Sequence, residues 1–578
     1  MSLSARLANL SPEKRQLLMQ RLQSSKSSEA VRQRQIQPQH PRPAFVPLSF
    51  NQQRLWFLDK LQPGSASYNT PIAIEIVGHL NVPAVEQTLT EIVRRHEVLR
   101  TYFVETADGK PTQAIAPAPV LSLITTDLSD VPERDREKAI ARLTAEGAQH
   151  PFQLDTAPPV RATLILLGAQ RHILLATVHH ILADGWSVGV LTREFHALYT
   201  AFSRGLPSPL PDLSIQYADY AMWQRQWLQG ERFAEQLDFW KQQMTGERPA
   251  LQLPTDRPRP AVQSFAGAKY KLALPDELYR DLKALSQAQN CTLFVTLLAA
   301  FNTLLYRYTG QTDITLGTAM VNRDRPQLKS AIGFFANTVL LRSSLQGNPA
   351  FTTLLQQVSQ TTVAALSHQE LPFDVLVKTL QPERDLSRNP LFQVWFALHQ
   401  TPMQKSLDFA GLQLRPIPVS HSTSRVDLSL DMAEIDRRLT CVFEYSTDLF
   451  DSATIAAIAQ HFQTMLTDIV AHPTRRLSEL ALLSESDVNA ILQTSRAPAL
   501  HVDAEVCVHE LFEQQMRRTP DVIAVVDGER SLTYRELNER ANRLARHLRS
   551  LGVGSDRLVA LCSDRSVDLL VGMLGILK

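Results

Sequence analysis

Hydrophobic positions alternate between strand-like and helix-like spacing from Val46 onward. A β-rich run at 71–80 is followed by a helical stretch at 82–100 and a short strand at 101–105. A strand, an amphipathic helix and a returning strand form one α/β layer unit. The first half of the chain therefore predicts an α/β lobe.

Two further apolar runs, 160–168 and 171–180, are separated by only two residues, Ala169 and Gln170. Such spacing favours a β-hairpin, and the helix-like pattern at 187–202 favours a helix directly after it. The second run ends on two histidines, His179 and His180, where a strand gives way to a loop.

The second half of the chain repeats this style of patterning. It predicts strands and helices at 269–275 (strand), 276–290 (helix), 292–308 (helix), 312–321 (strand), 337–342 (strand), 426–432 (strand), 438–446 (strand) and 452–471 (helix). The economical interpretation is two comparable α/β lobes that meet within 205–265. A site between the two lobes is then expected.

The ends of the chain differ from this pattern. Residues 11–22 carry a helix start, while the polar stretch from Gln23 onward is typical of a flexible connector. A third unit, with a hairpin turn at Asp527-Gly528 and a strand at 557–563, begins near Val508. The predicted organisation is a docking helix (1–22), a flexible linker (23–44), an N-terminal lobe (45–220), a C-terminal lobe (221–473), a linker (474–506) and a third unit (507–578).

Composition narrows the class of protein. Among 578 residues, 44% are hydrophobic, and 59 basic residues face 58 acidic ones, for a formal charge of +1. This balance argues against disorder and against nucleic-acid binding by bulk charge. The four cysteines are far apart, and no apolar run reaches the ~20 residues of a membrane span. We therefore expect a cytoplasmic protein with no bound metal or cofactor.

The sharpest local feature is H-H-I-L-A-D-G at 179–185. A loop held by a rigid strand can present an imidazole to a cleft, and Asp184 can turn back to fix that loop. Adjacent histidines on a strand point in opposite directions, which disfavours a shared metal site. The chain has no G-x-S-x-G nucleophile elbow. A histidine that acts as base or positioning group in acyl transfer between two bound substrates fits best.

The segment H-H-I-L-A-D-G-W-S resembles the active-site motif of nonribosomal peptide synthetase condensation domains, which are relatives of chloramphenicol acetyltransferase. Seven further segments match that family in order: S-F-N-Q-Q-R-L-W-F-L (49–58), R-H-E-V-L-R-T (95–101), Y-A-D-Y-A (217–221), I-G-F-F-A-N-T (332–338), H-Q-E-L-P-F (368–373), R-D-L-S-R-N-P (384–390) and R-V-D-L-S-L (425–430). The resemblance implies an α/β (α+β) fold of two chloramphenicol acetyltransferase-like lobes, arranged in a V with the active site in a tunnel between them.

The last unit resembles the opening of an adenylation domain, through L-T-Y-R-E-L (532–537) and the run 558–578. The phosphate loop of that family and an L-G-G-x-S carrier site are absent from this sequence, so we expect no adenylation by the chain itself. The resemblance implies substrates carried on the 4'-phosphopantetheine of separate carrier domains. The expected partners are the upstream and downstream carrier domains, the remainder of the adenylation domain and an upstream synthase at the N-terminal helix, with no nucleic acid or membrane.

The opening segment looks like the condensation class that takes an L-configured donor. The implied reaction joins a donor acyl, aminoacyl or peptidyl thioester to the amine of an acceptor aminoacyl thioester. By family position, His180 is the catalytic or positioning group, and Asp184 has a structural part paired with Arg323. The supporting residues of the resemblance are His179 as buried scaffold, Gly185 as an open tunnel floor for the acceptor arm, and Trp186 and Ser187 beside it.

Two other functions stay open at this point. The chain could be a catalytically silent platform that recognises carriers, although the intact His180 and Asp184 favour activity. It could also be a stand-alone acyltransferase to a soluble amine or alcohol, which the adjoining adenylation start disfavours. Product formation with carrier-bound and with free acceptors distinguishes these alternatives.

Overall fold

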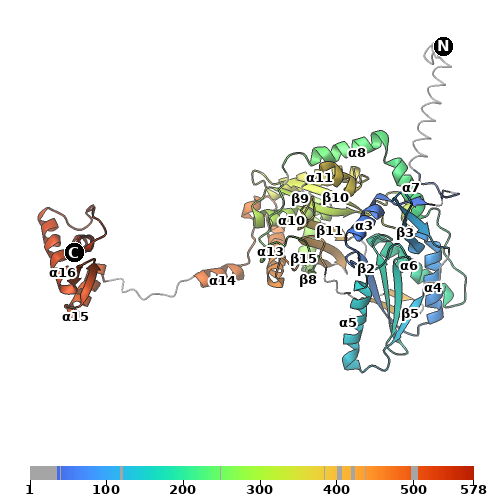
Figure 1. Cartoon of the computed structure of the whole chain (residues 1–578), viewed down its shortest axis with the longest axis horizontal. Coiled ribbons are helices and arrows are strands. Elements are labelled where there is room, and N and C mark those ends of the chain that lie inside the picture. Colours follow the sequence, from blue (N-terminus) through green and yellow to red (C-terminus); the bar gives the residue numbers. More distant parts are fainter. Residues whose placement is uncertain are drawn as a thin grey trace, which may run out of the picture. The chain divides into compact units, whose positions relative to one another are not determined.

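The computed structural model describes residues 35–578 except 40, 44, 118–121, 248, 383–384, 400–406, 410, 418, 420–422, 436–437 and 496–505. The helix expected at 11–22 lies outside the described residues. The chain divides into two compact units, Met1–Ser484 and Glu485–Lys578, and Figure 1 shows the elements of each.

A six-stranded mixed sheet forms the centre of the first half, in the order β12-β13-β2-β7-β6-β5. β7 (Arg171–His179) pairs antiparallel with β2 (Asn69–Val77) and with β6 (Val160–Leu166). The hairpin predicted from the two apolar runs is therefore confirmed. The remaining strands are β5 (Leu123–Asp127), parallel to β6, and β12 (Leu407–Phe409) and β13 (Leu412–Ile417), which come from the second half of the sequence.

Helices cover both faces of this sheet. On one face, α4 (Val82–Arg95) and α6 (Gly185–Phe202) enclose a core that includes Leu164 and Leu174. On the other face, α5 (Glu133–Gln149) packs over Ile165 and Ile173. Neighbouring strand residues point to opposite faces, so cover on both sides explains why β7 is an almost continuous apolar run.

The second half has its own six-stranded sheet, in the order β10-β9-β11-β14-β15-β8. Its strands are β8 (Gly267–Ala273), β9 (Asp313–Met320), β10 (Asn337–Ser344), β11 (Val394–His399), β14 (Leu428–Ile435) and β15 (Arg438–Ser446). The helices that pack with it are α9 (Asp276–Ala288), α10 (Leu293–Thr309), α11 (Phe351–Ser367) and α13 (Ser452–Ala471). The predicted strands and helices of this half are confirmed.

The central helix of this second core is α10. Thr292 caps its start by accepting from the Val295 backbone N–H, and Gly310 ends it in the left-handed conformation at φ 70°. Among the described residues, no single helix is long and apolar enough to cross a membrane, and the pair α9 and α10 passes that test only with a bend of 105°. The apolar surface of α10 packs into the protein core.

Shorter elements connect the two halves and complete the first unit. They are β1 (Val46–Pro47), α3 (Phe50–Leu61), η1 (Glu97–Arg100), β3 (Thr101–Glu105), β4 (Pro111–Ile115), α7 (Tyr217–Trp227), α8 (Gly230–Gln243), η2 (Pro326–Leu328), α12 (Phe373–Leu380) and η3 (Leu477–Glu479). Strands β1, β4 and β3 form a separate three-stranded sheet.

Two predicted boundaries need correction. The lobe boundary between 220 and 221 falls inside α7, whose Tyr217 and Tyr220 belong to the first core, whereas Trp240 of α8 belongs to the second. The linker predicted from residue 474 begins too early, because Leu477 is buried in the second core. Apolar burial continues across both expected boundaries.

The flexible linker predicted at 23–44 is also wrong for its described residues. Ile36 is fully buried in the first core, and Arg42 forms ion pairs with Asp219 at 3.1 Å and with Glu97. One apolar residue and one arginine thus hold residues 35–39 and 41–43 against the first core, although the composition around them is polar.

The second unit contains α14 (Glu485–Ser495), α15 (Val508–Arg518), β16 (Ile523–Asp527), β17 (Arg530–Thr533), α16 (Tyr534–Ser550) and α17 (Val567–Leu577). The predicted hairpin at Asp527-Gly528 is confirmed. The strand predicted at 557–563 is wrong: within the described residues β16 and β17 pair only with each other, and Leu558 is fully exposed. A strand requires a neighbour for its backbone hydrogen bonds.

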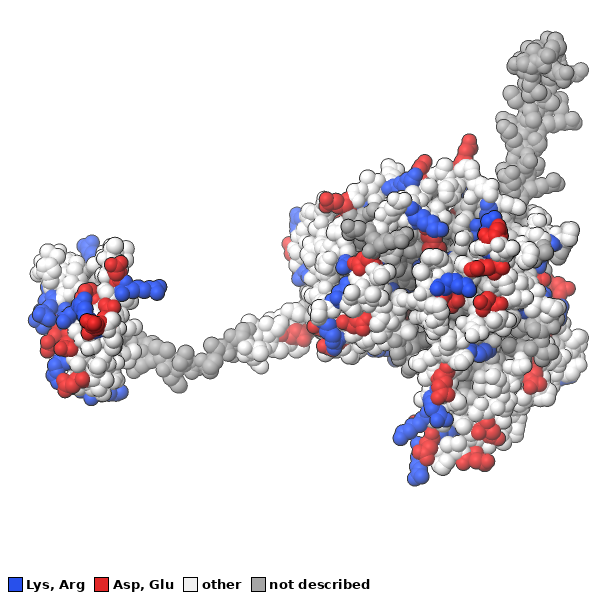
Figure 2. All heavy atoms as spheres, viewed as in Figure 1, with Lys and Arg blue, Asp and Glu red and all other residues white. Residues whose placement is uncertain are grey.

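Basic and acidic side chains are interspersed on the surface that Figure 2 shows, in keeping with the formal charge of +1. This distribution shows no wide basic face on that side of either unit.

Candidate functional site

The histidine motif lies between the end of β7 and the start of α6. β7 ends at His179, and Asp184 is the N-cap of α6, accepting a hydrogen bond from the Ser187 backbone N–H at 2.9 Å. A strand end and a capped helix start therefore hold the loop 180–184 from both sides.

His180 is fixed through both its backbone and its ring. Its backbone N–H donates to the Tyr68 carbonyl at 2.8 Å, and its Nδ1 lies 2.6 Å from the Ala183 carbonyl oxygen. Because a carbonyl only accepts, Nδ1 carries the proton and Nε2 carries the lone pair. No described residue forms a hydrogen bond with Nε2. The His180 ring packs against the Phe334 ring, and the two ring centroids are 4.5 Å apart.

The surroundings of His180 favour its neutral form. Burial, followed by the positive charge of Arg425, lowers the pKa of His180 to about 4, although the Ala183 carbonyl and Asp184 act in the opposite direction. The half-buried imidazole is therefore neutral near pH 7 and has a free acceptor nitrogen. It can orient an amine or accept a proton from it.

Asp184 is buried and its carboxylate is saturated with donors. Oδ1 accepts from the Ser187 backbone N–H, the Ser187 hydroxyl at 2.8 Å and Arg323 at 2.9 Å. Oδ2 accepts from the backbone N–H groups of Phe335 at 3.0 Å and Ala336 at 3.2 Å. Five hydrogen bonds leave this carboxylate no free position toward a substrate.

Arg323 follows β9 and is buried beside Asp184, so the expected pair is brought together. It also donates to the carbonyls of Leu328 and Ala331 and lies 4.2 Å above the Phe335 ring. Arg323 thus ties the loop between β9 and β10 to the start of α6.

The same loop passes directly beside His180. Asn51 of α3 donates to the Ala336 carbonyl at 2.8 Å, and Tyr217 of α7 donates to the Phe334 carbonyl at 2.8 Å. Four segments matched in the sequence therefore meet here: those that contain Asn51, Asp184, Tyr217 and Phe334. The wall of the site is a hydrogen-bonded junction between the two halves.

The remaining residues predicted for the site, His179, Gly185, Trp186 and Ser187, lie in or next to the histidine loop. His179 is buried, and its Nδ1 accepts from the Ile181 backbone N–H at 3.2 Å. A Cβ placed on Gly185 would meet no atom within 4 Å, so space is open there. Trp186 is partly exposed and donates through Nε1 to the Lys329 carbonyl at 3.0 Å, and Ser187 is buried beside Asp184.

Three residues around His180 were missed as site residues. Phe334 and Arg425 lie in segments that matched the family, I-G-F-F-A-N-T and R-V-D-L-S-L, but neither was assigned a role. Tyr68 lies directly before β2, and no motif marks it. Phe334 and Arg425 are the kind of residue that stands out in a matched segment, because each has a large side chain that is not buried in a core.

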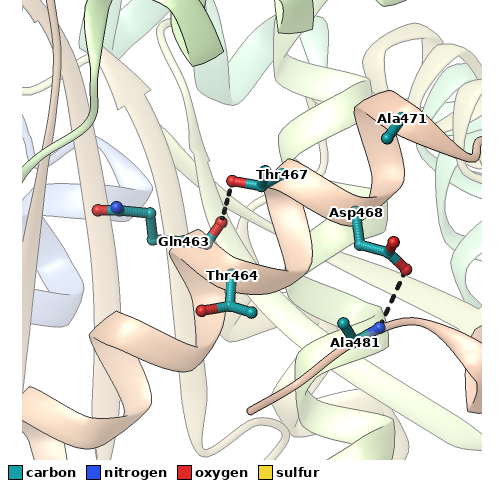
Figure 3. A pocket seen from close by; sticks show the side chains of 6 residues that line it. All are labelled: Gln463, Thr464, Thr467, Asp468, Ala471 and Ala481. Atoms are coloured by element: carbon teal, nitrogen blue, oxygen red, sulfur yellow. Dashed lines mark hydrogen bonds between the residues drawn. The ribbon is translucent and has the colours of Figure 1, made fainter. Parts of the chain in front are cut away.

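A metal site and a separate surface hollow were also considered as candidate sites. Among the described residues no group of three His, Cys, Asp or Glu side chains could hold a metal ion. A surface hollow of about 320 Å³ is lined by α13 and Ala481, including Thr464 and Asp468 (Figure 3), and contains no residue of the histidine loop.

Two family models match the sequence. The condensation domain model matches residues 43–492, and the AMP-binding enzyme model matches residues 512–578. The first match covers more than half of the chain and contains every residue of the site.

The curated relatives include proteins named as synthetases. The chain is 43% identical to malpinin synthetase of Mortierella alpina over 533 residues, and this alignment covers 92% of this chain and 7% of that protein. It is 39% identical over 577 residues to phosphinothricin tripeptide synthetase PhsC of Streptomyces viridochromogenes, covering 100% of this chain and 53% of that protein. The chain thus spans a small to moderate part of the relatives it matches.

Solved structures agree with the sequence matches. The X-domain from teicoplanin biosynthesis aligns with a TM-score of 0.69 and 28% identity, over 77% of this chain and 99% of that one. A four-domain nonribosomal peptide synthetase bound to AMP and glycine aligns with a TM-score of 0.77 and 24% identity, over 92% of this chain and 41% of that one.

Proposed function

The chain belongs to the condensation domain family, and from that premise we propose that it forms peptide bonds in nonribosomal peptide biosynthesis. The donor is a carrier-bound acyl, aminoacyl or peptidyl thioester, and the acceptor is the α-amine of a carrier-bound aminoacyl thioester. The observation that carries this proposal is the placement of the His180 ring, whose Nδ1 is hydrogen-bonded to the Ala183 carbonyl and whose Nε2 has no bond to a described residue. A pKa lowered to about 4 by burial agrees with a neutral ring.

In the proposed reaction, the acceptor nitrogen attacks the donor thioester carbon and a C–N bond forms. The C–S bond then breaks, the thiolate leaves with its electron pair, and the proton lost by the amine returns to that sulfur. No oxidant, metal or external energy source is needed, because the thioester is already activated.

His180 is proposed to act mainly by positioning. An α-amine has a pKa of about 8, so a fair fraction of it is neutral at pH 7 without a base. Alignment of two bound reactants can supply roughly 7–11 kcal/mol. General-base assistance contributes a factor of about 10²–10⁴. Nε2 would accept from the attacking amine and stabilise the positive charge that develops on it.

The neighbouring residues support that arrangement without touching the reactants. Asp184 and Arg323 are proposed to hold the loop, His179 to pack beneath it, and Ser187 and Trp186 to anchor α6 against the loop between β9 and β10. The open space at Gly185 is proposed to admit the acceptor arm.

The partners follow from the same proposal. Carrier domains upstream and downstream would present their 4'-phosphopantetheine arms from opposite faces, through a tunnel between the two lobes. The segment at 512–578 would form part of an adenylation domain.

A binding platform is the second candidate. One solved structure that aligns with this chain, at 28% identity and a TM-score of 0.69, is a complex of the X-domain and OxyB from teicoplanin biosynthesis. A condensation-type fold can therefore dock another protein. A platform function predicts binding of carriers or of another protein without product.

The proposal is tested with donor and acceptor carrier proteins that have been loaded chemically. The full chain is mixed with both, and the acceptor arm is followed by mass spectrometry with several donor classes. A gain equal to the donor acyl mass supports condensation. No gain with carrier-bound or free acceptors, despite measurable carrier binding, would favour the platform, whereas gain on a free amine alone would indicate a stand-alone acyltransferase.

A further inference from the structure

The segment directly before β14 is held tightly by the second half of the chain. Ser424 is fully buried and donates from its backbone N–H to the Phe265 carbonyl at 2.9 Å. Asp427 is buried and ion-paired with Arg259, and its backbone N–H donates to the Gln393 carbonyl. Arg425 lies between these two anchors and is itself exposed.

Arg425 reaches across to the first half of the chain. Its Nη2 and Nε donate to the Ser67 carbonyl at 2.8 and 3.2 Å. Its guanidinium lies 4.5 Å from the centre of the Tyr68 ring. Two hydrogen bonds to one carbonyl and a stacked ring fix both the position and the orientation of the guanidinium.

The turn that Arg425 contacts also holds His180. The Tyr68 carbonyl accepts the His180 backbone N–H at 2.8 Å, and the next residue, Asn69, pairs with His179 where β2 meets β7. One continuous path therefore leads from the anchored second half, through Arg425 and the Ser67-Tyr68 turn, to the histidine loop.

We propose that Arg425 is a positioning residue for His180, which it serves by clamping the Ser67-Tyr68 turn and by placing one positive charge beside the imidazole. This inference rests on the proposed function. It adds a role for the second half of the chain, because Arg425 acts on a histidine that the first half supplies.

The positive charge of Arg425 lowers the pKa of His180. Titratable or charged groups that face the loop are His179 from β7, Asp184 at the start of α6, Arg323 after β9 and Arg425 before β14. Asp184 favours the protonated imidazole, but its own charge is compensated by Arg323. Arg425 disfavours protonation, so it helps keep Nε2 available as an acceptor as the pH falls.

The test compares three variants of the full chain. Arg425→Gln removes the charge, Arg425→Lys keeps the charge but loses the forked contact, and Arg438→Gln is the control. Arg438 is an exposed arginine that pairs with Asp276 at 3.0 Å and has no contact with the histidine loop. The His180 ring is followed by NMR titration of histidine-labelled protein, with its signal assigned by its absence in His180→Asn.

The titration midpoint of His180 is expected to rise by about half a pH unit in Arg425→Gln, which is the order of a neighbouring unit charge near the surface. It stays near the wild-type value in Arg425→Lys and in Arg438→Gln. In the condensation assay, Arg425→Gln and Arg425→Lys should both lower kcat several-fold at unchanged KM, because both lose the clamp on the Ser67-Tyr68 turn.

An unchanged His180 midpoint in folded Arg425→Gln would overturn the electrostatic part of the inference. Wild-type kcat in Arg425→Lys would overturn the clamp. The NMR titration needs no turnover, so it tests the link between Arg425 and His180 separately from the proposed function. If the His180 midpoint shifts in Arg425→Gln but no sample, including wild type, forms product, the proposed function is contradicted and the link between Arg425 and His180 is supported.

Discussion

His180 combines two properties that a flexible histidine would lack. Its ring is held by Ala183 and packed against Phe334, and its backbone is held by Tyr68. A fixed ring loses little conformational entropy when substrates bind, so in the proposed reaction it would lower the barrier through orientation and not only through proton transfer. The residues around it therefore matter through the precision with which they hold this ring.

Asp184 gives the first test at the residue scale. Asp184→Asn removes one partner of a buried ion pair and places an amide NH₂ against backbone donors. We expect a loss of about 3–5 kcal/mol in the free energy of unfolding, measured by urea denaturation. Activity should fall together with the folded fraction. A soluble variant with wild-type stability and no activity would instead give Asp184 a direct part in the chemistry.

Gly185 tests the expected path of the acceptor arm. Since a Cβ there meets no atom within 4 Å, Gly185→Leu should fold with a melting temperature close to that of the wild type. Its side chain would fill the open space, and acceptor turnover should fall at least tenfold. Gly189→Leu, one turn further along α6, is the control. Unchanged turnover in Gly185→Leu would contradict the proposed role of Gly185 as the tunnel floor.

His179 makes a prediction about stability and pH. Burial, followed by the charges of His180 and Arg425, lowers the pKa of His179 to about 3. In the unfolded chain a histidine has a pKa of about 6.5, so the unfolded state binds the proton first as the pH falls. The stability that His179 contributes is full above about pH 6.5 and is lost progressively toward pH 3.

The measurement is the free energy of unfolding from pH 8 to pH 4, in wild type and in His179→Gln. The variant should show a shallower loss of stability below pH 6.5, because its residue 179 does not titrate. Parallel curves for the two proteins would show that His179 is not held neutral in the folded state.

At the scale of elements, the loop between β9 and β10 organises the site. It supplies Arg323, Phe334 and the backbone donors to Asp184, and Asn51 of α3 and Tyr217 of α7 hold it from the other side. The site is thus assembled from elements that are far apart in the sequence, and this loop donates three hydrogen bonds to the Asp184 carboxylate, one from Arg323 and two from the backbone.

Tyr217→Phe tests this coupling. The Tyr217 hydroxyl donates to the Phe334 carbonyl and lies 2.8 Å from the Ser49 hydroxyl. Its loss should cost about 1–3 kcal/mol of stability and lower kcat several-fold, because Phe334 packs on His180. Tyr308→Phe removes a hydroxyl that bonds His461 in the second core and should leave kcat unchanged. Equal kcat effects from the two changes would refute a specific coupling.

Much of this architecture could be predicted from apolar periodicity, because most strands and helices bury a regular face. The hairpin of β6 and β7 and the helix α10 were predicted on that basis. The strand expected at 557–563 failed because pattern alone does not supply a neighbouring strand. The linker prediction was wrong for residues 35–39 and 41–43, because the average polarity of the segment hid the contributions of Ile36 and Arg42.

The site could be predicted in part. His180, Asp184 and Gly185 were recognisable because they lie within seven residues of one another, and Arg323 because of its family position. Tyr68 and Ala183 contact His180 through their backbone carbonyls, which carry no mark of side-chain identity. Arg425 acts from the far half of the chain, and its proximity to His180 arises only when the two halves fold together.

At the scale of the whole molecule, the unit Met1–Ser484 contains every residue of the site, and neither half of that unit is complete without the other. The second half supplies β12 and β13 to the first sheet, Arg323 to Asp184, and Arg425 to the Ser67-Tyr68 turn. We therefore expect substrate chemistry to depend on the joint fold of both halves.

The central claim is that a rigid, neutral His180 promotes amide formation between two carrier-bound substrates. The most direct measurement is the single-turnover rate of acceptor acylation, with saturating loaded carriers, for wild type and His180→Ala. We predict a loss on the order of 10²–10⁴-fold in the variant, with unchanged melting temperature and carrier affinity. Equal rates in the two proteins would contradict the account.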